Sequence, residues 1–283
     1  MNNVLLVGEI GLNGNGDLEI TKKLINICHA FGVDYVKFQK RTLDKCYTQE
    51  ELNKPRESPW GTTTREQKQG LEYSKEEYNE IDKYCKMVGI KWFASVWDIE
   101  SVNFIESYDV PFIKIPSALI SHIELLNSVK RSGIPVIIST GMSEWEEIKT
   151  AISILGDNLK YVLHTTSSYP TPVDEMNLNK ITTLKDSAPI SGSYKIGFSN
   201  HHQGTFFCTV AAVLGAEMIE FHVTLDRAMY GSDQAASIEP NGIRLIVDHI
   251  RDLDVAMGDG YWKRKIEPSE IPVIKKLKRN LDF

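Results

Sequence analysis

The sequence of 283 residues contains only four cysteines, and none of them belongs to a CxxC pair. Closely spaced cysteine pairs are typical of zinc sites and redox centres, and disulfide frameworks need denser cysteines in shorter chains. Cys28, Cys85 and Cys208 fall within helical patterns, where we expect buried free thiols. The cysteine content therefore predicts no disulfide and fits a reducing, cytoplasmic setting.

The sequence also lacks a long apolar run and an export signal. No run approaches the about 20 apolar residues that a membrane-spanning helix needs. Met1 leads through two asparagines into a strand-like run, without the charged, apolar and small-residue regions of a signal peptide. We therefore expect a cytoplasmic protein with no membrane partner.

A third absence is that of an extended basic stripe. The formal net charge is −6, whereas a nucleic-acid-binding face needs clustered lysines and arginines. One short basic cluster stands out, and it comprises Lys275, Lys276, Lys278 and Arg279. We interpret it as the solvated end of a helix rather than as a polyanion site, and we predict no nucleic-acid partner.

What the sequence does contain is a repeated order of strand and helix. Eight apolar runs with the character of β-strands alternate with helical stretches, and polar residues stand at or just after the end of each run. The runs are Val4–Ile10, Val33–Gln39, Lys91–Ser95, Phe112–Ser117, Pro135–Thr140, Lys160–Thr166, Lys195–Ser199 and Glu217–Thr224. Eight such units predict an α/β fold, the single-domain TIM (β/α)8 barrel, whose active site gathers side chains from the carboxyl ends of the strands.

The helical stretches have recognisable starts. They are Asp17–Phe31, Ser74–Val88, Ile99–Tyr108, His122–Arg131, Ser143–Leu155, Asn177–Ser187, Gly204–Leu214 and Pro240–Met257. Asp17 suits an N-cap, because its side chain can accept from the first free backbone N–H groups. Ser74 with Glu77, and Ser143 with Glu146, have the spacing of a capping box. We therefore expect reciprocal caps at these two helix starts.

The organisation along the chain is that of one barrel with two additions. We expect the barrel to span residues 1–262, since about 250 residues are typical of this fold. The longest connection, residues 40–73, follows the second strand; connections of this length are usually functional lids or disordered, so it is a candidate to fold over the barrel mouth. Residues 263–283 are expected to form a C-terminal tail or helix, with nothing of its own to pack around.

Two histidines stand at the ends of the last two strands. His201 follows the seventh strand and His222 lies within the eighth, so that both imidazoles can converge on one point. Two imidazoles with a carboxylate and open positions suit a divalent transition metal that acts as a Lewis acid. Glu9 or Asp233 could supply the oxygen ligand. The alternative is that one histidine is a hydrogen-bonded core residue.

Two lysines lie inside apolar strands, at Lys37 and Lys114. A buried ammonium group is costly unless it pairs with an anion. Hydroxyl groups occupy comparable strand-end positions, at Ser95, Ser117, Ser139, Thr140 and Ser199. Charge-assisted bonds with hydroxyl donors can hold a phosphate or a carboxylate, so we predict an anion site. The alternative is that the lysines point outward or pair with structural carboxylates such as Glu9.

A proline-rich segment follows the sixth strand. The Tyr169–Pro170 bond is a candidate cis peptide, because X–Pro bonds have only a small trans preference. The prolines would fix a rigid loop that presents Ser167 and Tyr169 at the barrel mouth, although rigid loop architecture alone explains them equally well. The glycine-rich stretch Gly11–Gly16 matches neither a Rossmann fingerprint nor a P-loop, which argues against a nucleotide site.

Taken together, these motifs resemble the sialic acid synthases, also called N-acetylneuraminate synthases, and their relatives that make other nonulosonic acids. The matching segments are Glu9–Asp17, Val36–Gln39, Lys114–Ser117, Ser139–Met142, Tyr169–Pro172, Gly197–His201 and Ile219–His222. The resemblance implies a TIM barrel that condenses phosphoenolpyruvate with an open-chain aldose. It further implies a 3-deoxy-2-ulosonic acid and phosphate as products, and a divalent metal, Mn²⁺ first with Mg²⁺ or Co²⁺ as alternatives.

The resemblance also implies roles for individual residues. His201 and His222 would bind the metal, and Tyr169 and Asp233 would face the acceptor sugar. The residues implied to hold phosphoenolpyruvate or to act on it are Glu9, Lys37, Gln39, Ser95, Lys114, Ser117, Ser139, Ser167 and Ser199. The implied reaction is attack of C3 of phosphoenolpyruvate on a metal-polarised aldehyde, followed by addition of water at C2 and loss of phosphate. A homodimer is the implied assembly.

The sequence departs from the family pattern on the acceptor side. Family members have Lys-Ile-x-Ser-Gly followed by an acidic residue, whereas this chain has Ala118 and Leu119. Leucine cannot transfer a proton, although Asp233 or Glu220 could take over that role. The sequence ends at Phe283, where typical members continue into a small antifreeze-like domain that contributes to the acceptor site. We therefore expect an altered acceptor, or alternatively a non-catalytic barrel that binds phosphoenolpyruvate or a sugar acid as a regulatory or binding subunit.

Overall fold

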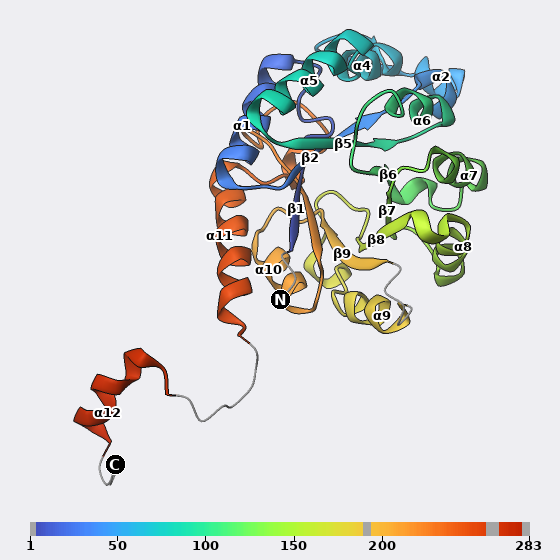
Figure 1. Ribbon diagram of the computed structural model, residues 1–283. Coiled ribbons are helices and arrows are strands. Elements are labelled where there is room, and N and C mark those ends of the chain that lie inside the picture. The colour runs from blue at the N-terminus through green and yellow to red at the C-terminus, as the bar shows by residue number, and fades with distance from the viewer. Residues whose placement is uncertain (1–3, 189–193, 259–265, 279–283) are drawn as a thin grey trace.

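The computed structural model describes residues 4–188, 194–258 and 266–278, and its centre is a closed barrel of parallel strands (Figure 1). Around the barrel the strand order is β1-β10-β9-β8-β7-β6-β5-β2. The strands are β1 (Leu5–Glu9), β2 (Tyr35–Lys40), β5 (Lys91–Val96), β6 (Ile113–Ile115), β7 (Val136–Ser139), β8 (Leu159–His164), β9 (Lys195–Asn200) and β10 (Met218–His222). The predicted TIM (β/α)8 barrel is confirmed.

Helices surround the barrel and alternate with its strands (Figure 1). They are α1 (Leu18–Phe31), α5 (Lys75–Val88), α6 (Ile99–Ile105), α7 (Ile123–Ser132), α8 (Trp145–Leu155), α9 (Asn179–Ser187), α10 (Phe206–Val213) and α11 (Pro240–Ala256). Most boundaries fall within two residues of the expected ones. The fourth expected strand, Phe112–Ser117, is shorter in the structure: β6 stops at Ile115, because Pro116 has no N–H for the ladder and the 3₁₀ helix η1 (Ser117–Leu119) begins directly after it.

Two of the three predicted helix starts are confirmed. The Asp17 carboxylate accepts from the N–H groups of residues 19 and 20, at 2.7 and 3.2 Å. Ser74 and Glu77 form the expected capping box at α5. The Ser143–Glu146 box is wrong: the Ser143 hydroxyl donates to the Gly141 carbonyl instead, and α8 starts one residue later with a box between residues 144 and 147.

The connection after β2 has secondary structure of its own. It contains α2 (Leu43–Cys46), α3 (Gln49–Leu52), the hairpin β3 (Pro55–Ser58) and β4 (Gly61–Thr63), and α4 (Thr64–Leu71). The Trp60 ring at the hairpin turn makes an edge contact with the Tyr230 ring, at 5.6 Å between centroids. The connection therefore reaches the loop that follows β10, on the side of the barrel where the strands end.

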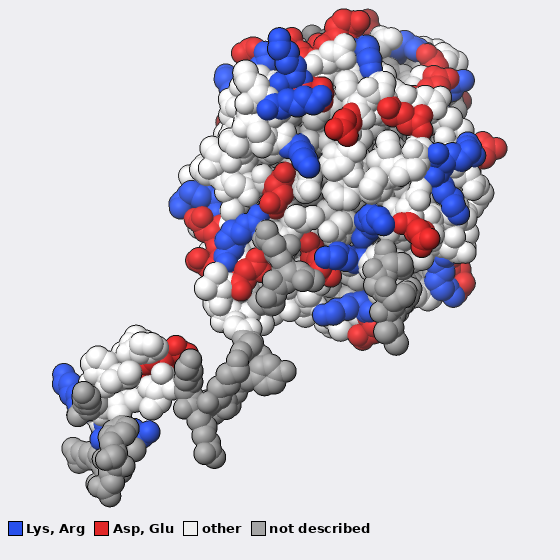
Figure 2. All heavy atoms as spheres, in the orientation of Figure 1, with Lys and Arg blue, Asp and Glu red and all other residues white. Residues whose placement is uncertain are grey.

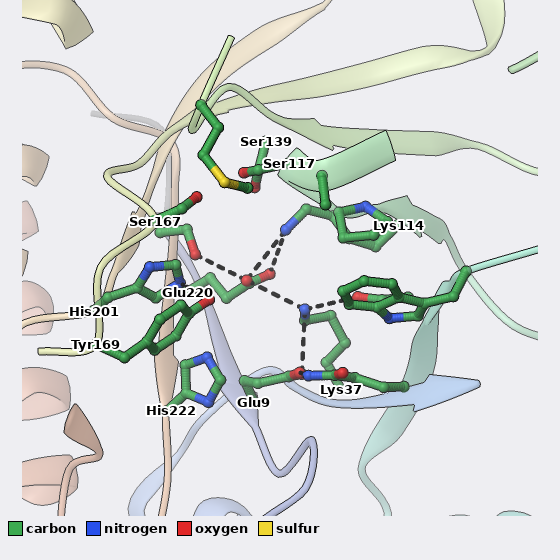
Figure 3. Close-up of a pocket in the computed structure, with 17 residues that line it drawn as sticks. Glu9, Lys37, Lys114, Ser117, Ser139, Ser167, Tyr169, His201, Glu220 and His222 are labelled. Atoms are coloured by element: carbon green, nitrogen blue, oxygen red, sulfur yellow. Dashed lines mark hydrogen bonds and ion pairs between the residues drawn. The ribbon is translucent and has the colours of Figure 1, made fainter. Parts of the chain in front are cut away.

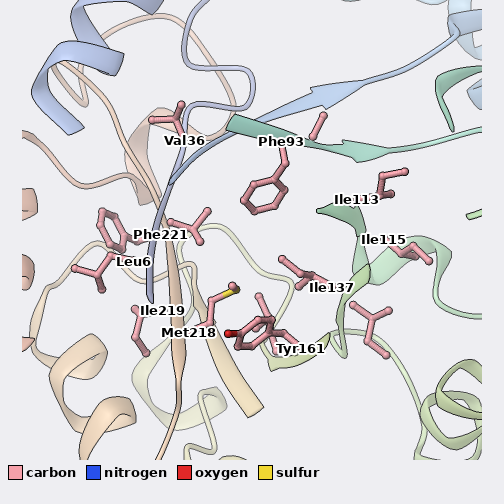
Figure 4. Packing of buried hydrophobic residues seen from close by; sticks show 14 of the residues in the cluster. Leu6, Val36, Phe93, Ile113, Ile115, Ile137, Tyr161, Met218, Ile219 and Phe221 are labelled. Atoms are coloured by element: carbon pink, nitrogen blue, oxygen red, sulfur yellow. The ribbon is translucent and has the colours of Figure 1, made fainter. Parts of the chain in front are cut away.

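Aromatic side chains fill the barrel interior one layer before the strand ends. Tyr35, Phe93, Phe112 and Tyr161 meet in edge contacts, with centroids 5.7 to 6.0 Å apart; Figure 4 shows Phe93 and Tyr161 within this packing. Because side chains alternate along a strand, the residues two positions further on also face inward. Three of these are Lys37, Ser95 and Lys114, so the aromatic layer lies directly beneath a polar pocket.

The surface of the protein, its helices and its C-terminal segment complete the description of the fold. On the face drawn in Figure 2, acidic and basic side chains are interspersed and form no basic stripe. None of the helices in the described ranges is both long and apolar enough to cross a bilayer. The C-terminal segment contains η5 (Pro268–Glu270) and α12 (Ile271–Leu277). Arg279 of the basic cluster and the expected boundary at residue 262 lie outside the described residues.

Candidate active site

A cavity of about 170 Å³ opens at the carboxyl ends of the barrel strands (Figure 3). Its lining comprises Glu9, Lys37, Gln39, Ser95, Trp97, Lys114, Pro116, Ser117, Ala118, Ser139, Met142, Ser167, Tyr169, Ser199, His201, Glu220 and His222. Every site residue predicted from the sequence is in this set except Asp233 and Thr140. The Thr140 hydroxyl donates instead to the Leu163 carbonyl, at 3.3 Å. Both lysines face the cavity, so the alternative in which they point outward is wrong.

The floor of the cavity is a cluster of two lysines and two glutamates. Lys114 Nζ donates to both carboxylate oxygens of Glu220, at 3.1 and 3.0 Å. Lys37 Nζ lies 3.2 Å from Glu220 Oε1 and 3.2 Å from Glu9 Oε2. All four side chains are at most 5% exposed. The lysines are thus buried and paired with carboxylates, as the alternative of structural ion pairs predicts. They nevertheless line the cavity.

Burial and mutual attraction set the charge states of this cluster. Burial lowers the pKa of Lys114 to about 8, and the attraction of Glu220 only partly opposes it. Burial would raise the pKa of Glu220, but the two ammonium groups lower it below the ordinary value. Burial raises the pKa of Glu9, against the pull of Lys37. Lys114 is therefore the cation that loses its proton most readily as the pH rises.

Serine hydroxyls surround the rest of the cavity. Ser95 accepts a hydrogen bond from Lys37 at 3.0 Å, and Ser199 donates to Glu220 at 2.9 Å. Ser117, Ser139 and Ser167 lie together at the other end of the cavity (Figure 3). The Ser139 hydroxyl is buried and has no hydrogen-bond partner among the described residues, which leaves it available to a ligand.

A glycine allows these hydroxyls to converge. A Cβ at Gly141 would lie 2.1 Å from Ser167 Oγ and 3.0 Å from Ser117 Oγ. The Gly141 N–H donates to Ser117 Oγ at 3.1 Å, which orients that hydroxyl. Any larger residue at position 141 would therefore push two of the serines apart.

The two predicted metal ligands lie side by side. The rings of His201 and His222 are 5.4 Å apart between centroids. Nδ1 of His201 donates to the Thr166 carbonyl at 2.8 Å, which leaves Nε2 to accept from the Tyr169 hydroxyl at 3.0 Å. Burial, with a smaller contribution from His222, lowers the pKa of His201 to about 3, so this imidazole is neutral.

The predicted cis bond between Tyr169 and Pro170 is present.

The fit of this pair to a divalent metal is partial. Across the described ranges, no three histidine, cysteine or acidic side chains are grouped to hold a metal ion. His222 Nδ1, however, is buried without a hydrogen-bond partner in the part of the chain that the structure describes. The nearest acidic oxygen to it is Asp233 Oδ2, at 3.7 Å. Imidazole nitrogens are donors that Mn²⁺, Co²⁺ or Zn²⁺ accepts, so the unpartnered Nδ1 of His222 fits such an ion, and so does Nε2 of His201 once the Tyr169 hydroxyl is displaced from it.

Some cavity residues were not in the predicted set. Glu220 is the most important: the sequence analysis names it only as a substitute for the missing acid, although its spacing of two from His222 puts both on the same face of β10. Met142 is 69% exposed and has a φ of 58°; no sequence pattern marks a methionine in a left-handed conformation. Trp97 and Pro116 belong to loops, where periodicity gives no orientation.

Comparison with known proteins identifies the family. Residues 24–261 match the model of the NeuB family. The N,N'-diacetyllegionaminic acid synthase of Campylobacter jejuni is 33% identical over 98% of this chain and 84% of its own length. The human N-acetylneuraminate-9-phosphate synthase is 33% identical over 98% of this chain and 77% of its own length. A crystal structure of the N-acetylneuraminic acid synthetase of Leptospira borgpetersenii superposes with a TM-score of 0.80 at 30% identity, covering 99% of this chain and 94% of that one. The chain therefore belongs to the NeuB family.

Proposed function

We propose that this chain condenses phosphoenolpyruvate with an open-chain aldose in a metal-dependent reaction, and that the products are a 3-deoxy-2-ulosonic acid of the nonulosonic, sialic-like class and phosphate. The observation that carries the proposal is the meeting of Lys37, Lys114, His201 and His222 around one cavity. The relatives named as synthases of N,N'-diacetyllegionaminic acid and of N-acetylneuraminate 9-phosphate support the product class.

In this proposal the ammonium groups bind the acid. Lys37 and Lys114 exchange part of their contact with Glu220 for charge-assisted hydrogen bonds to phosphate or carboxylate oxygens of phosphoenolpyruvate. Ser117, Ser139 and Ser167 add hydroxyl donors at the other end of the cavity. Gln39, which donates to Glu9 at 2.8 Å, and Ser95 hold the lysine–glutamate cluster in place.

The metal of the proposal is Mn²⁺, with Co²⁺ or Mg²⁺ as alternatives, and His201 and His222 would hold it. When bound, such an ion supplies a Lewis acid for the aldehyde oxygen. Two nitrogen donors favour Mn²⁺ or Co²⁺ over Mg²⁺, which prefers oxygen ligands.

The proposed bond changes balance with one water molecule. A carbon–carbon bond forms between C3 of phosphoenolpyruvate and the aldehyde carbon, water adds at C2, and the C–O bond to phosphate breaks. We assign the acceptance of the water proton to Glu9, a buried carboxylate with a raised pKa. Lys114, which holds its proton up to about pH 8, is assigned as the donor of the proton that the aldehyde oxygen takes up as it becomes a hydroxyl group. Tyr169 and Asp233 would orient the acceptor beside the imidazoles.

Phosphate release from the purified protein tests the proposal. We expect release only when phosphoenolpyruvate, MnCl₂ and a suitable aldose are all present, and the Lys37→Met variant should release none. Lys195→Met is the matched control, because that lysine is exposed and pairs with Glu217 at the opposite end of β9. Binding of phosphoenolpyruvate without release across a broad aldose panel would contradict the proposal and support the non-catalytic barrel.

Two further parts of the proposal concern the setting of the enzyme. We place it in the cytoplasm, because phosphoenolpyruvate is a highly charged metabolite that does not cross membranes unaided. We also propose a homodimer, and light scattering after size-exclusion chromatography checks this mass directly.

A further inference from the structure

A buried arginine lies one residue beyond the end of β2. Lys37, Gln39 and Arg41 are spaced by two along the chain, so their side chains share the inward face of this strand and its continuation. Lys37 and Gln39 line the catalytic cavity, whereas Arg41 does not. Arg41 is only 7% exposed. Because arginine is almost never buried unless it is paired, the partners of this guanidinium indicate its role.

The charge of Arg41 is only loosely compensated. Its Nε lies 3.8 Å from Glu72 Oε1 and completes no hydrogen bond within the described ranges. The other oxygen of Glu72 lies 3.6 Å from the ammonium group of Lys40, so this carboxylate is shared between two cations. A second guanidinium nitrogen donates to the Tyr47 hydroxyl at 3.5 Å, beyond the usual hydrogen-bond distance. Burial of a guanidinium costs free energy, and these long contacts do not explain it.

The close polar contact of Arg41 is with Gln39. Nη2 of Arg41 donates to Gln39 Oε1. At the other end of the same amide, Gln39 Nε2 donates to Glu9 Oε1 at 2.8 Å. A guanidinium can only donate and a carboxylate can only accept, so a single orientation of the amide between them satisfies both. Without the guanidinium, the amide would lose the donor that fixes the position of its oxygen.

Two further contacts restrict this arrangement. The guanidinium carbon of Arg41 lies 4.8 Å from the centre of the Trp97 ring, within cation–π range. Gly11 packs against the bond between Gln39 and Glu9: a Cβ there would lie 3.1 Å from Gln39 Nε2 and 2.8 Å from Glu9 Oε1. The loop after β1 therefore leaves the Glu9 carboxylate no room to turn on that side.

The result is a Glu9 carboxylate with two unequal oxygens. Oε1 accepts from Gln39, whereas Oε2 is buried and completes no hydrogen bond in the part of the chain that the structure describes. Oε2 lies 3.2 Å from Lys37 Nζ, and Glu9 lines the catalytic cavity (Figure 3). A carboxylate oxygen has two lone pairs, so Oε2 retains the capacity to accept a proton from a reacting water molecule.

We propose that Arg41 is a positioning residue for the condensation. Its guanidinium orients the Gln39 amide, the amide holds Glu9 through Oε1, and Oε2 is thereby the atom that accepts a proton from the water that adds at C2. As the water oxygen bonds to C2, its proton passes to Oε2 and Glu9 becomes a neutral acid. Arg41 keeps its own proton throughout. This inference rests on the proposed function, because it assigns an atom and a supporting side chain to one step of that reaction.

Kinetics of phosphate release test the positioning role. With phosphoenolpyruvate, MnCl₂ and an aldose that supports release, Arg41→Met should lower kcat roughly 100-fold, the cost of an ångström-scale displacement of a catalytic group. The dissociation constant of phosphoenolpyruvate should stay within about three-fold, because Lys37 and Lys114 keep their charges and their contacts with Glu220. Arg41→Lys keeps a cationic donor for Gln39 and should lower kcat less, by roughly ten-fold.

Arg65→Met is the matched control. Arg65 belongs to the same connection after β2, donates to Asp44 at 2.7 Å and does not line the cavity. Its replacement should leave kcat unchanged. An equal loss of kcat in Arg65→Met and Arg41→Met would show general loosening of the connection and would overturn the inference.

A double-variant cycle with Gln39→Met measures the contact without relying on turnover. If Arg41 acts through Gln39, the second substitution adds little once the first is made, so kcat and the unfolding constant in urea should both be non-additive. The double variant should match the more impaired single variant within about two-fold. Losses that multiply in both quantities would show that the two side chains act independently, contrary to the proposal.

Failure of this inference differs from failure of the condensation. If the unchanged protein releases no phosphate with any aldose but the unfolding cycle shows the coupling, the condensation fails and the orientation of Gln39 by Arg41 stands. If phosphate is released and Arg41→Met has the kcat of the unchanged protein, the positioning role fails and the condensation stands.

Discussion

At the scale of single residues, the site depends on how four buried ionic groups share their charge. Glu220 accepts from Lys114 through both oxygens and also faces Lys37, while Glu9 faces Lys37 alone. Two positive and two negative charges leave the empty cluster neutral. An incoming acid therefore competes with Glu220 for the ammonium groups, and the cluster alone does not balance the negative charge that the acid adds.

Replacement of Lys114 by methionine should remove one of the two cations that bind the acid. We expect phosphoenolpyruvate affinity to fall roughly 100-fold, because two charge-assisted hydrogen bonds are lost. The free energy of unfolding should fall by about 3 kcal/mol, since Glu220 keeps Lys37 but loses its bidentate partner. Titration calorimetry and urea unfolding measure the two effects. An affinity within a factor of three of the unchanged protein would contradict the assignment, and the exposed Lys195→Met change should alter neither quantity.

The lowered pKa of Lys114 predicts a pH dependence of substrate binding. This lysine is charged below about pH 8 and neutral above it, and only the charged form attracts an anion. The affinity for phosphoenolpyruvate should therefore be constant at neutral pH and decline as the pH rises through about 8. Binding measured from pH 6 to 10 checks this, with Lys114→Arg as the comparison, because arginine stays charged throughout. A flat profile for the unchanged protein up to pH 10 would show that Lys114 does not bind the acid.

At the scale of elements, the loops after β1, β2 and β10 contact one another, and the loop after β10 carries Asp233. A Cβ at Gly16 would lie 2.0 Å from the Gly70 carbonyl oxygen, so the first loop contacts α4 backbone to backbone. The Trp60 ring lies against Gly70 and meets Tyr230 from the β10 loop. These contacts connect the β2 hairpin to the loop that holds Asp233 3.7 Å from His222.

Replacement of Trp60 by alanine should therefore make the loop that carries Asp233 more mobile, without displacing Lys37 or Lys114. We expect kcat/KM for the acceptor to fall roughly ten-fold or more, since small displacements of positioning groups are costly in rate. The dissociation constant of phosphoenolpyruvate should stay unchanged. Trp145→Ala, at an exposed position on α8, is the control. Equal losses for both substrates would point to general destabilisation rather than to positioning.

The elements also show where sequence patterns succeed and fail. The barrel strands are predictable because each is an apolar run flanked by turn residues, and the inward face of Lys37 and Lys114 follows from alternation. The hairpin of β3 and β4 is not, because Pro55, Arg56 and Glu57 are exposed on both faces and leave no periodic signal. The predicted capping box at α8 is misplaced by one residue, because the Ser143 hydroxyl donates to the carbonyl of Gly141 two residues before it, a local competition that capping-box spacing does not show.

At the scale of the whole molecule, the order of the βα units determines which side chains meet. Glu9 and His222 are register partners across β1 and β10, although they are separated by most of the chain. The resemblance in motifs predicts which residues belong to the site. Spacing alone does not, since it cannot show that Glu220 pairs with Lys114 across the barrel. A larger cavity beside the site, lined by Tyr47, Trp97 and Leu119 among others, could not be predicted either, because it is made by loops whose side-chain directions have no period.

Ligand-linked stability should report the binding of both substrate and metal by the whole barrel. At concentrations about 100 times the dissociation constant, a ligand adds about 2.7 kcal/mol to the unfolding free energy. For a domain of this size, we expect a rise of roughly 5 °C in Tm with phosphoenolpyruvate and a further rise with MnCl₂. EDTA should remove the second increment only. The double variant His201→Ala and His222→Ala should respond to phosphoenolpyruvate but not to Mn²⁺, and a retained Mn²⁺ increment would place the metal elsewhere.

The most direct test of the central claim is anomalous diffraction from crystals grown with MnCl₂ and phosphoenolpyruvate. The account predicts a manganese peak within coordination distance of His201 and His222, and an enol phosphate whose oxygens contact both Lys37 and Lys114. A peak remote from the two imidazoles, or an enol phosphate bound away from the two ammonium groups, would contradict it.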